Sequence, residues 1–215
     1  MKNVIDRTLA LSLFLMLVVI PVIPITMLAI FIEDPGNVFF TQDRVGKNGK
    51  TFRIIKFRSM YKDADKRIKA QIANGTTDAL NFKQDASSMV TKVGAFIRKT
   101  SIDELPQLLN IIKGDMSIVG PRPLQALEVE VYCTTEQHKE IMTKRLSLKP
   151  GLLCDWQITP QKDQMPFDER MLLDCSYVDK QSLTADVSLI AKGCEPPLPT
   201  HTLRGRGFLG RVQTY

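Results

Sequence analysis

The sequence has little of what metal-binding and nucleic-acid-binding domains depend on. It contains two histidines, and its four cysteines (Cys133, Cys154, Cys175 and Cys194) form no CxxC pair, so we expect no structural zinc site. We interpret the cysteines as reduced thiols of a cytosolic compartment. Aromatic residues make up 7% of the chain, which is few for a surface that stacks bases, and we recognise no nucleic-acid reader motif. We therefore expect no nucleic acid partner.

Charge is absent from one long segment near the N-terminus. Residues 9–32 form an apolar run of 24 residues without a charged side chain. A bilayer core needs about 20 such residues. A secretory signal peptide would have a shorter apolar region and a small-residue cleavage site, whereas Glu33-Asp34-Pro35-Gly36 follows here. Pro21 and Pro24 interrupt the run and predict a bend in a membrane helix.

The residues alone leave two membrane topologies open. Basic residues flank both ends of the apolar run, with Lys2 and Arg7 before it and Arg44, Lys47 and Lys50 after it. Positive charge prefers the cytoplasmic side, which favours a helix that breaks at the prolines and returns to the same face. Prolines also occur in ordinary spanning helices, so a single crossing remains the alternative. The net charge of +6 suits an anionic membrane surface or a phosphorylated substrate.

The remainder reads as one domain of the α+β class, followed by a tail. We expect a membrane segment at 1–33, a catalytic domain at 34–194 and a basic tail rich in Pro, Gly and Arg at 195–215. Strands at 38–40 and 52–57 flank a Gly46-Lys47-Asn48-Gly49 turn and predict a β-hairpin. Helices are expected at 61–73, from Ser101 to about 113, at 128–146 and at 167–177, and a polar loop at 78–88.

An adjacent pair of acids is the first candidate for chemistry. Ser101-Ile102-Asp103-Glu104 fits a capping box, which would place Asp103 and Glu104 in the first turn of a helix. The helix dipole favours negative charge there, so both should be ionised at neutral pH. Because neighbours on a helix point about 100° apart, one carboxylate could face a phosphorus atom while the other holds Mg²⁺. The alternative is that the acids only complement the dipole of a helix start.

Basic residues near this pair suit phosphate. Arg98 precedes the acids, and Arg122 follows them in a turn that Pro121 and Pro123 stiffen. Arginine binds phosphate through two parallel hydrogen bonds, and a rigid turn fixes their direction. Lys56 and Arg58 add positive charge. The combination indicates a phosphate site, although each residue alone would be a solvated charge.

Several blocks together resemble one family, the small bacterial sugar transferases, also called monotopic phosphoglycosyl transferases. The similarity extends over about residues 1–190. The matching residues are Asp6, the membrane prolines, VFFTQDRVG at 38–46, KFRSM at 56–60, Val93-Gly94 with Arg98, SIDELPQL at 101–108, KGDMSIVGPRP at 113–123, KPG at 149–151, and Asp174 with Tyr177.

The resemblance implies a fold, a reaction and a site. It implies a re-entrant membrane helix broken at proline and a small, mainly helical catalytic domain with amphipathic interfacial helices, on the cytoplasmic face of the bacterial inner membrane. It implies transfer of a sugar 1-phosphate from a UDP-sugar to polyprenol (undecaprenyl) phosphate, with UMP released, as the first membrane step of a surface glycan pathway. A homodimer is compatible with it.

The resemblance also assigns roles to residues. It makes Asp103 a nucleophile that forms an aspartyl-phosphosugar and Glu104, with Asp103, the ligand of Mg²⁺. Arg98 and Arg122 would hold phosphate. The remaining substrate contacts that we expect are Lys56, Arg58, Pro121, Gln157, Asp174 and Tyr177.

The sequence departs from the family pattern at three places, all of them outside the acid pair. The membrane break is Ile20-Pro21 rather than Ser-Pro, residues 152–161 lack a usual basic residue, and Met89 stands where an arginine is usual. The changed 152–161 segment supports one alternative, a membrane-anchored binding or scaffolding homologue without activity.

Overall fold

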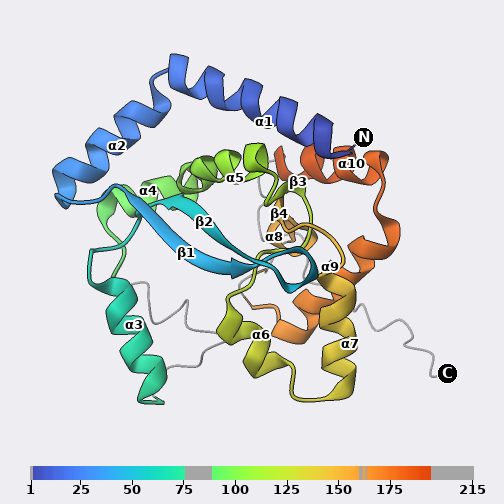
Figure 1. Cartoon of the computed structure of the whole chain (residues 1–215). Coiled ribbons are helices and arrows are strands. Elements are labelled where there is room, and N and C mark those ends of the chain that lie inside the picture. Colours follow the sequence, from blue (N-terminus) through green and yellow to red (C-terminus); the bar gives the residue numbers. More distant parts are fainter. Residues whose placement is uncertain (1, 76–88, 160–161, 163, 195–215) are drawn as a thin grey trace, which may run out of the picture.

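The computed structural model describes residues 2–75, 89–159, 162 and 164–194. Its elements surround a central hairpin (Figure 1). In chain order they are α1 (Lys2–Val19), α2 (Val22–Glu33), β1 (Phe39–Val45), η1 (Lys47–Gly49), β2 (Thr51–Phe57), α3 (Ala64–Ala73), α4 (Lys92–Lys99), η3 (Ile102–Gln107), α5 (Leu108–Lys113), β3 (Ser117–Val119), α6 (Ala126–Tyr132), α7 (Glu136–Arg145), β4 (Gly151–Leu153), α8 (Asp155–Ile158), α9 (Phe167–Lys180) and α10 (Leu183–Cys194). The mixture of helices and small sheets confirms the α+β class.

The apolar N-terminal run is a pair of helices that bend by 63° at their junction. The break lies at Ile20 and Pro21, which confirms the predicted bend, and Pro21 is the N-cap of α2. Pro24 lies in the first turn of α2, where a missing N–H breaks no helical hydrogen bond. In the described part of the chain no single helix is long and apolar enough to cross a membrane, whereas the bent pair α1–α2 meets the length and composition criteria together.

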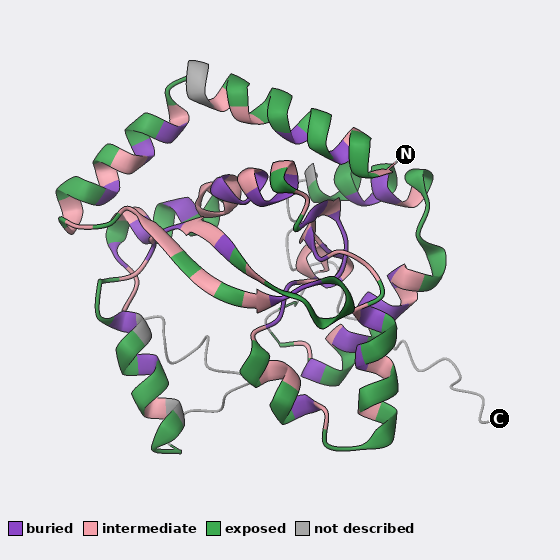
Figure 2. Cartoon of the chain, viewed as in Figure 1, coloured by how far each residue is buried: buried purple, intermediate pink, exposed green. Residues whose placement is uncertain are grey.

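The bent pair turns many apolar side chains outward. Figure 1 shows α1 and α2 as an arch over α5 and α4, and α1 packs against α5 and β3 while α2 packs against α4. Much of the outer surface of the arch is exposed (Figure 2). The large exposed apolar residues include Leu9, Leu13, Met16, Ile20, Ile25, Leu28 and Ile32. Such a continuous apolar surface marks a membrane or protein contact.

The predicted β-hairpin is present and longer than expected. β1 and β2 pair antiparallel from Phe39↔Phe57 to Val45↔Thr51. Asn48 and Gly49 reverse the chain in the left-handed region, with φ of 55° and 77°. Asn and Gly favour that conformation, which explains why this sequence turns here. One face of β2 contributes Ile54 to a core with Leu108 and Ile111.

A short parallel pair, β3 and β4, brings distant segments together and was not predicted. Ser117 pairs with Gly151 and Val119 with Leu153. The two backbones touch at Gly120 and Gly151, where a Cβ on Gly151 would lie 2.1 Å from the Gly120 nitrogen. Glycine is therefore required at this contact, which fixes the start of the Gly120–Pro123 turn.

Other sequence predictions met mixed outcomes. Helices near 61–73 and 167–177 are confirmed as α3 and α9, but the single helix at 128–146 is wrong, because the chain breaks between α6 and α7 after the C-cap Cys133. Helices α4 and α10 were missed; both expose apolar side chains, Phe96 on α4 and Leu183, Val187 and Ile190 on α10. The loop predicted at 78–88 and the tail at 195–215 lie outside the described residues.

Candidate active site

The acid pair lies on a tight 3₁₀ turn rather than at a capped α-helix. Ser101 has a left-handed backbone (φ 57°) and its side chain makes no capping hydrogen bond, so the predicted capping box is wrong. An N-cap needs an extended backbone, which Ser101 does not have. Pro106 lies inside the segment, and Ile102–Gln107 continues directly into α5, which ends at Gly114 as predicted.

Glu104 contacts the hairpin through an ion pair with Lys56. Lys56 on β2 donates from Nζ to Glu104 Oε1 at 2.9 Å, and both side chains are largely buried. Burial lowers the pKa of Lys56, and the Glu104 carboxylate opposes this effect. This ion pair connects β2 to η3, so the lysine predicted to contact phosphate is next to one of the candidate catalytic acids.

The other acid, Asp103, is held among charges of both signs. Burial raises its pKa most, the positive charges of Lys56 and Arg98 lower it, and the Glu104 carboxylate raises it, so that the resulting pKa is about 6. The predicted reason for ionisation, a helix dipole that favours negative charge at Asp103, is therefore wrong, because burial raises the pKa of this residue. Its carboxylate is still the main form at pH 7 because the pKa lies below that pH.

Arg122 projects from the turn that follows β3. Its guanidinium carbon lies 5.2 Å from the centre of the Trp156 ring, within the range of a cation–π contact. Trp156 is buried on α8, so the arginine rests on a fixed platform. The guanidinium carbon of Arg170 also lies close to this ring, 5.1 Å from its centre.

A buried ion pair supports the Arg122 turn from behind. Arg145 Nε donates to Asp174 Oδ2 at 2.8 Å, with both side chains 1% exposed. Arg145 Nη2 also donates to the carbonyl oxygen of Arg122. Burial raises the pKa of Asp174, whereas Arg145 and the Arg122 backbone N–H favour the carboxylate. The pair therefore positions the turn that presents Arg122.

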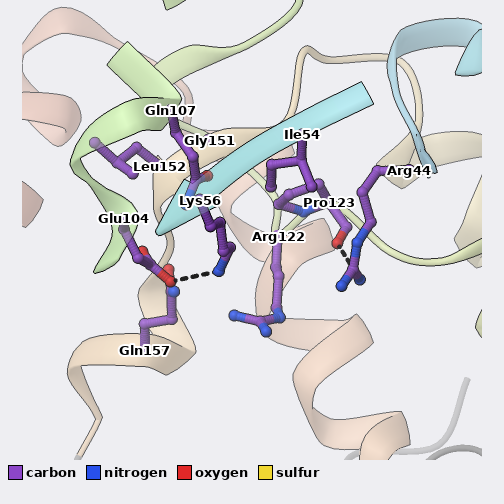
Figure 3. A pocket seen from close by; sticks show the side chains of 10 residues that line it. All are labelled: Arg44, Ile54, Lys56, Glu104, Gln107, Arg122, Pro123, Gly151, Leu152 and Gln157. Carbon is purple, nitrogen blue, oxygen red and sulfur yellow. Dashed lines mark hydrogen bonds and ion pairs between the residues drawn. The ribbon is translucent and has the colours of Figure 1, made fainter. Parts of the chain in front are cut away.

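Lys56, Glu104 and Arg122 converge on one pocket (Figure 3), whereas Asp103 is not among the residues that line it. It is lined by Arg44, Ile54, Lys56, Glu104, Gln107, Arg122, Pro123, Gly151, Leu152 and Gln157. Its free volume is about 10 Å³, roughly one water. This volume is too small to enclose a nucleotide sugar, and in Figure 3 the Lys56 and Glu104 side chains of the lining point toward each other.

Sequence reasoning missed two polar residues of this pocket. Arg44 donates from Nη1 to the Pro123 carbonyl oxygen at 3.2 Å and lies 3.4 Å from Glu128. Burial lowers its pKa to about 10, still far above neutral, so it stays charged. Gln107 is the other. Both occur in the blocks that resemble the family, but nothing in their local spacing distinguished them.

Some predicted site residues lie elsewhere. Arg58 contacts the carbonyl oxygen and carboxylate of Asp34 at the end of α2. Arg98 donates to Ser59 Oγ at 2.8 Å, and its charge acts on Asp103. Pro121 is buried in the Arg122 turn. Asp174 and Tyr177 are buried outside the pocket lining, Tyr177 beside Asp186, and direct substrate contacts for them stay predictions.

The acid pair could supply only two protein ligands to a metal ion. Within the part of the chain that the structure describes, no group of three or more His, Cys, Asp or Glu side chains could hold an ion. Asp103 and Glu104 supply carboxylate oxygens, and Mg²⁺ typically takes one or two protein carboxylates and completes its shell with phosphate and water. The residues present fit that pattern.

Comparison with known families decides the relationship. The sequence model of the bacterial sugar transferase family matches residues 1–196. The chain belongs to this family. The matched range contains the bent helix pair, the hairpin, the acid pair and the Arg122 turn, so the elements that build the pocket are family elements.

Individual relatives agree in name with this assignment. The chain is 44% identical over 158 residues to "Galactosyl transferase CpsE" of Streptococcus agalactiae serotype III, covering 74% of this chain and 34% of that protein. It is 38% identical over 164 residues to "Undecaprenyl-phosphate galactose phosphotransferase" of Salmonella typhimurium, covering 74% and 33%. "Exopolysaccharide production protein ExoY" of Rhizobium meliloti is 37% identical over 177 residues, covering 80% and 75%. The matched region thus spans about a third of the first two relatives and three quarters of the third.

Proposed function

We propose that this protein transfers a sugar 1-phosphate from a UDP-sugar to polyprenol (undecaprenyl) phosphate and releases UMP. The main supporting observation is a pocket lined by Glu104, Lys56 and Arg122 in a member of this family. Asp103 is next to Glu104 in the chain, and the charges of Lys56 and Glu104 act on it. The name of the Salmonella relative, an undecaprenyl-phosphate galactose phosphotransferase, supports the acceptor and the transferred group. We further propose that the product begins a surface glycan.

The proposed chemistry uses Asp103 as nucleophile. A carboxylate oxygen of Asp103 attacks the phosphorus that bears the sugar, the bond from this phosphorus to the bridging oxygen breaks, and UMP leaves with the bond electrons. An oxygen of polyprenol phosphate then attacks the same phosphorus and displaces Asp103, giving polyprenyl diphosphate-sugar and regenerating the carboxylate. Such covalent catalysis replaces one difficult step by two easier ones.

The cations around the pocket serve the phosphates. Arg122, fixed on Trp156 and by the Arg145–Asp174 pair, is suited to bind the diphosphate. Lys56 is released from Glu104 when the pocket opens and supplies a second positive charge. Arg98 lies close enough to influence Asp103 and would attract the attacked phosphate group. The cations outnumber the two acids, which favours binding of a substrate with several negative charges.

Glu104 and Asp103 are the residues that would hold Mg²⁺. When bound, the ion would neutralise charge on the diphosphate and its leaving group. Gln157, which lines the pocket, is proposed to contact the nucleotide or sugar. Arg58, Pro121, Asp174 and Tyr177 remain proposed substrate contacts, although they are not among the residues that line the pocket.

We also propose a membrane placement. The apolar bend at Ile20 and Pro21 would enter the bilayer, and the charged ends at Lys2 and Glu33 would stay at one face, the cytoplasmic face of the inner membrane. The exposed outer surface of the arch supports this arrangement. The exposed apolar residues of α4 and α10 would lie at the interface.

The test is UMP release from the protein in nanodiscs with Mg²⁺, polyprenol phosphate and a panel of UDP-sugars. We expect UMP with one sugar, dependent on the lipid phosphate and reduced at least about 10³-fold in Asp103→Asn. Asp43→Asn, which changes an exposed acid of β1, is the matched control and should retain activity. Wild-type activity in Asp103→Asn would overturn the nucleophile, and absence of UMP with every sugar would favour the inactive scaffolding homologue.

A further inference from the structure

A second hollow lies at the N-terminal end of α1, and it differs from the active-site pocket in every lining residue. Its cavity volume is about 230 Å³. Three lysines line it, Lys2, Lys47 and Lys149, together with the uncharged polar residues Asn3, Ser117 and Gln181. No acidic residue is among the described residues that line it. Five separate parts of the chain therefore build a basic, polar hollow.

The charge in this hollow is only partly neutralised. Lys2 pairs with Asp186 on α10 and donates to the Tyr177 hydroxyl at 2.9 Å. Among the described residues, neither Lys47 nor Lys149 has an ion-pair partner. These two lysines are left to receive an anion.

Two further positive charges act on Lys149. Burial lowers the pKa of Lys149, and the positive charges of Arg7 and Lys47 lower it further. The carboxylates of Asp115, which is exposed, and of Asp6, which accepts a hydrogen bond from Ser117, partly oppose them. An anion bound between the lysines would relieve this repulsion.

Exposed apolar side chains lie on α1 and α10, close in sequence to residues that line the hollow. Val4, one residue after Asn3, is 65% exposed, and Leu183, two residues after Gln181, is 53% exposed. The Lys2–Asp186 pair holds the beginning of α1 against α10, and Figure 1 shows these two elements side by side at the N-terminus. A basic site flanked by exposed apolar side chains matches the boundary between headgroups and acyl chains.

We propose that the hollow between Lys47 and Lys149 binds the phosphate of an anionic phospholipid headgroup, with Lys2 holding its wall in place. This inference rests on the membrane placement in the proposed function, because that placement puts the start of α1 at the interface. The headgroup would fix how the catalytic domain sits on the bilayer. No step of sugar phosphate transfer is involved.

The experiment measures how fast each lysine is acetylated in nanodiscs of phosphatidylcholine alone and of phosphatidylcholine with phosphatidylglycerol. We expect phosphatidylglycerol to slow labelling of Lys47 and Lys149 by about fivefold. Lys66 on α3 and Lys99 at the end of α4, both exposed, are internal controls and should change less than about twofold. Lys99 lies at the end of α4, the helix that packs against α2, so it is included to report the general effect of a charged membrane surface.

Two further measurements test which kind of phosphate binds and whether it binds in this hollow. Inorganic phosphate added to phosphatidylcholine nanodiscs should give no protection; protection equal to that of the lipid would assign the hollow to free phosphate and overturn the lipid proposal. Lys47→Gln, in the exposed hairpin turn, should abolish protection of Lys149, whereas Lys66→Gln should not. Equal slowing at all four lysines, or none, would also contradict the proposal. None of these readouts depends on transfer activity, so failure here and failure of the proposed reaction are distinguishable.

Discussion

Removal of Arg145 should uncouple the Arg122 turn from the domain core. Arg145 is 2% exposed, pairs with Asp174 at 2.8 Å and donates to the Arg122 carbonyl oxygen. Arg145→Met keeps similar bulk but leaves the Asp174 carboxylate buried without its cation. Breaking a buried pair in this way costs about 3–5 kcal/mol.

That cost converts into a measurable melting shift. For a chain of this size each kcal/mol lowers Tm by about 2–4 °C, so we expect Arg145→Met to melt about 6–20 °C below wild type. Because Arg122 loses its support, UMP release should fall by more than the remaining folded fraction explains. Thermal unfolding in detergent, followed by Trp156 fluorescence, measures the first effect at a site next to the change.

The neighbouring residue provides a matched control. Lys144 pairs with Asp179 at the same distance, 2.8 Å, but the two side chains are 46% and 58% exposed. Lys144→Met should leave Tm near the wild-type value, since solvent screens such a pair. The reasoning is refuted if Arg145→Met and Lys144→Met melt alike, or if Arg145→Met melts with the wild type.

Three other changes test separate parts of the structure. Gly151→Ala should destabilise by about 1–3 kcal/mol or more, because its Cβ would meet the backbone of the facing glycine at 2.1 Å; a melting curve equal to wild type would contradict the close contact. Burial raises the pKa of the Cys154 thiol well above its usual value, so little thiolate forms as pH rises; iodoacetamide at pH 8 should modify it only after unfolding, and rapid labelling of the folded protein would refute its burial. Lys56→Met should lower kcat/KM for UMP release about 10²–10³-fold with a smaller change in Tm, whereas a pure loss of stability would show Lys56 to be structural.

The sequence predicted best those elements that local chemistry determines. The Asn48-Gly49 turn and the bend at Pro21 follow from backbone preferences of single residues, and both are present. The parallel β3–β4 pair could not be predicted, because three-residue strands leave no periodic pattern and their pairing depends on the contact of Gly120 with Gly151. The break between α6 and α7 was missed because residues 128–146 contain no Pro or Gly.

The site was predictable in residue type more than in geometry. Lys56, Glu104, Arg122 and Gln157 meet at the pocket as expected. The capping box at Ser101 failed, since the left-handed backbone there depends on how η3 docks on β2 through the Lys56–Glu104 pair. The supporting role of Arg145 had no sequence signal, because nothing in the sequence distinguishes this buried basic residue from its exposed basic neighbour Lys144.

The most direct test of the account is to look for the covalent intermediate itself. The protein is incubated with its UDP-sugar and Mg²⁺ in the absence of polyprenol phosphate, quenched and analysed by intact mass and by peptide mapping. The account predicts a mass increase of one sugar phosphate on the peptide that contains Asp103, lost on addition of polyprenol phosphate and absent from Asp103→Asn. UMP formation without any such adduct, or an adduct on another residue, would contradict Asp103 as the nucleophile.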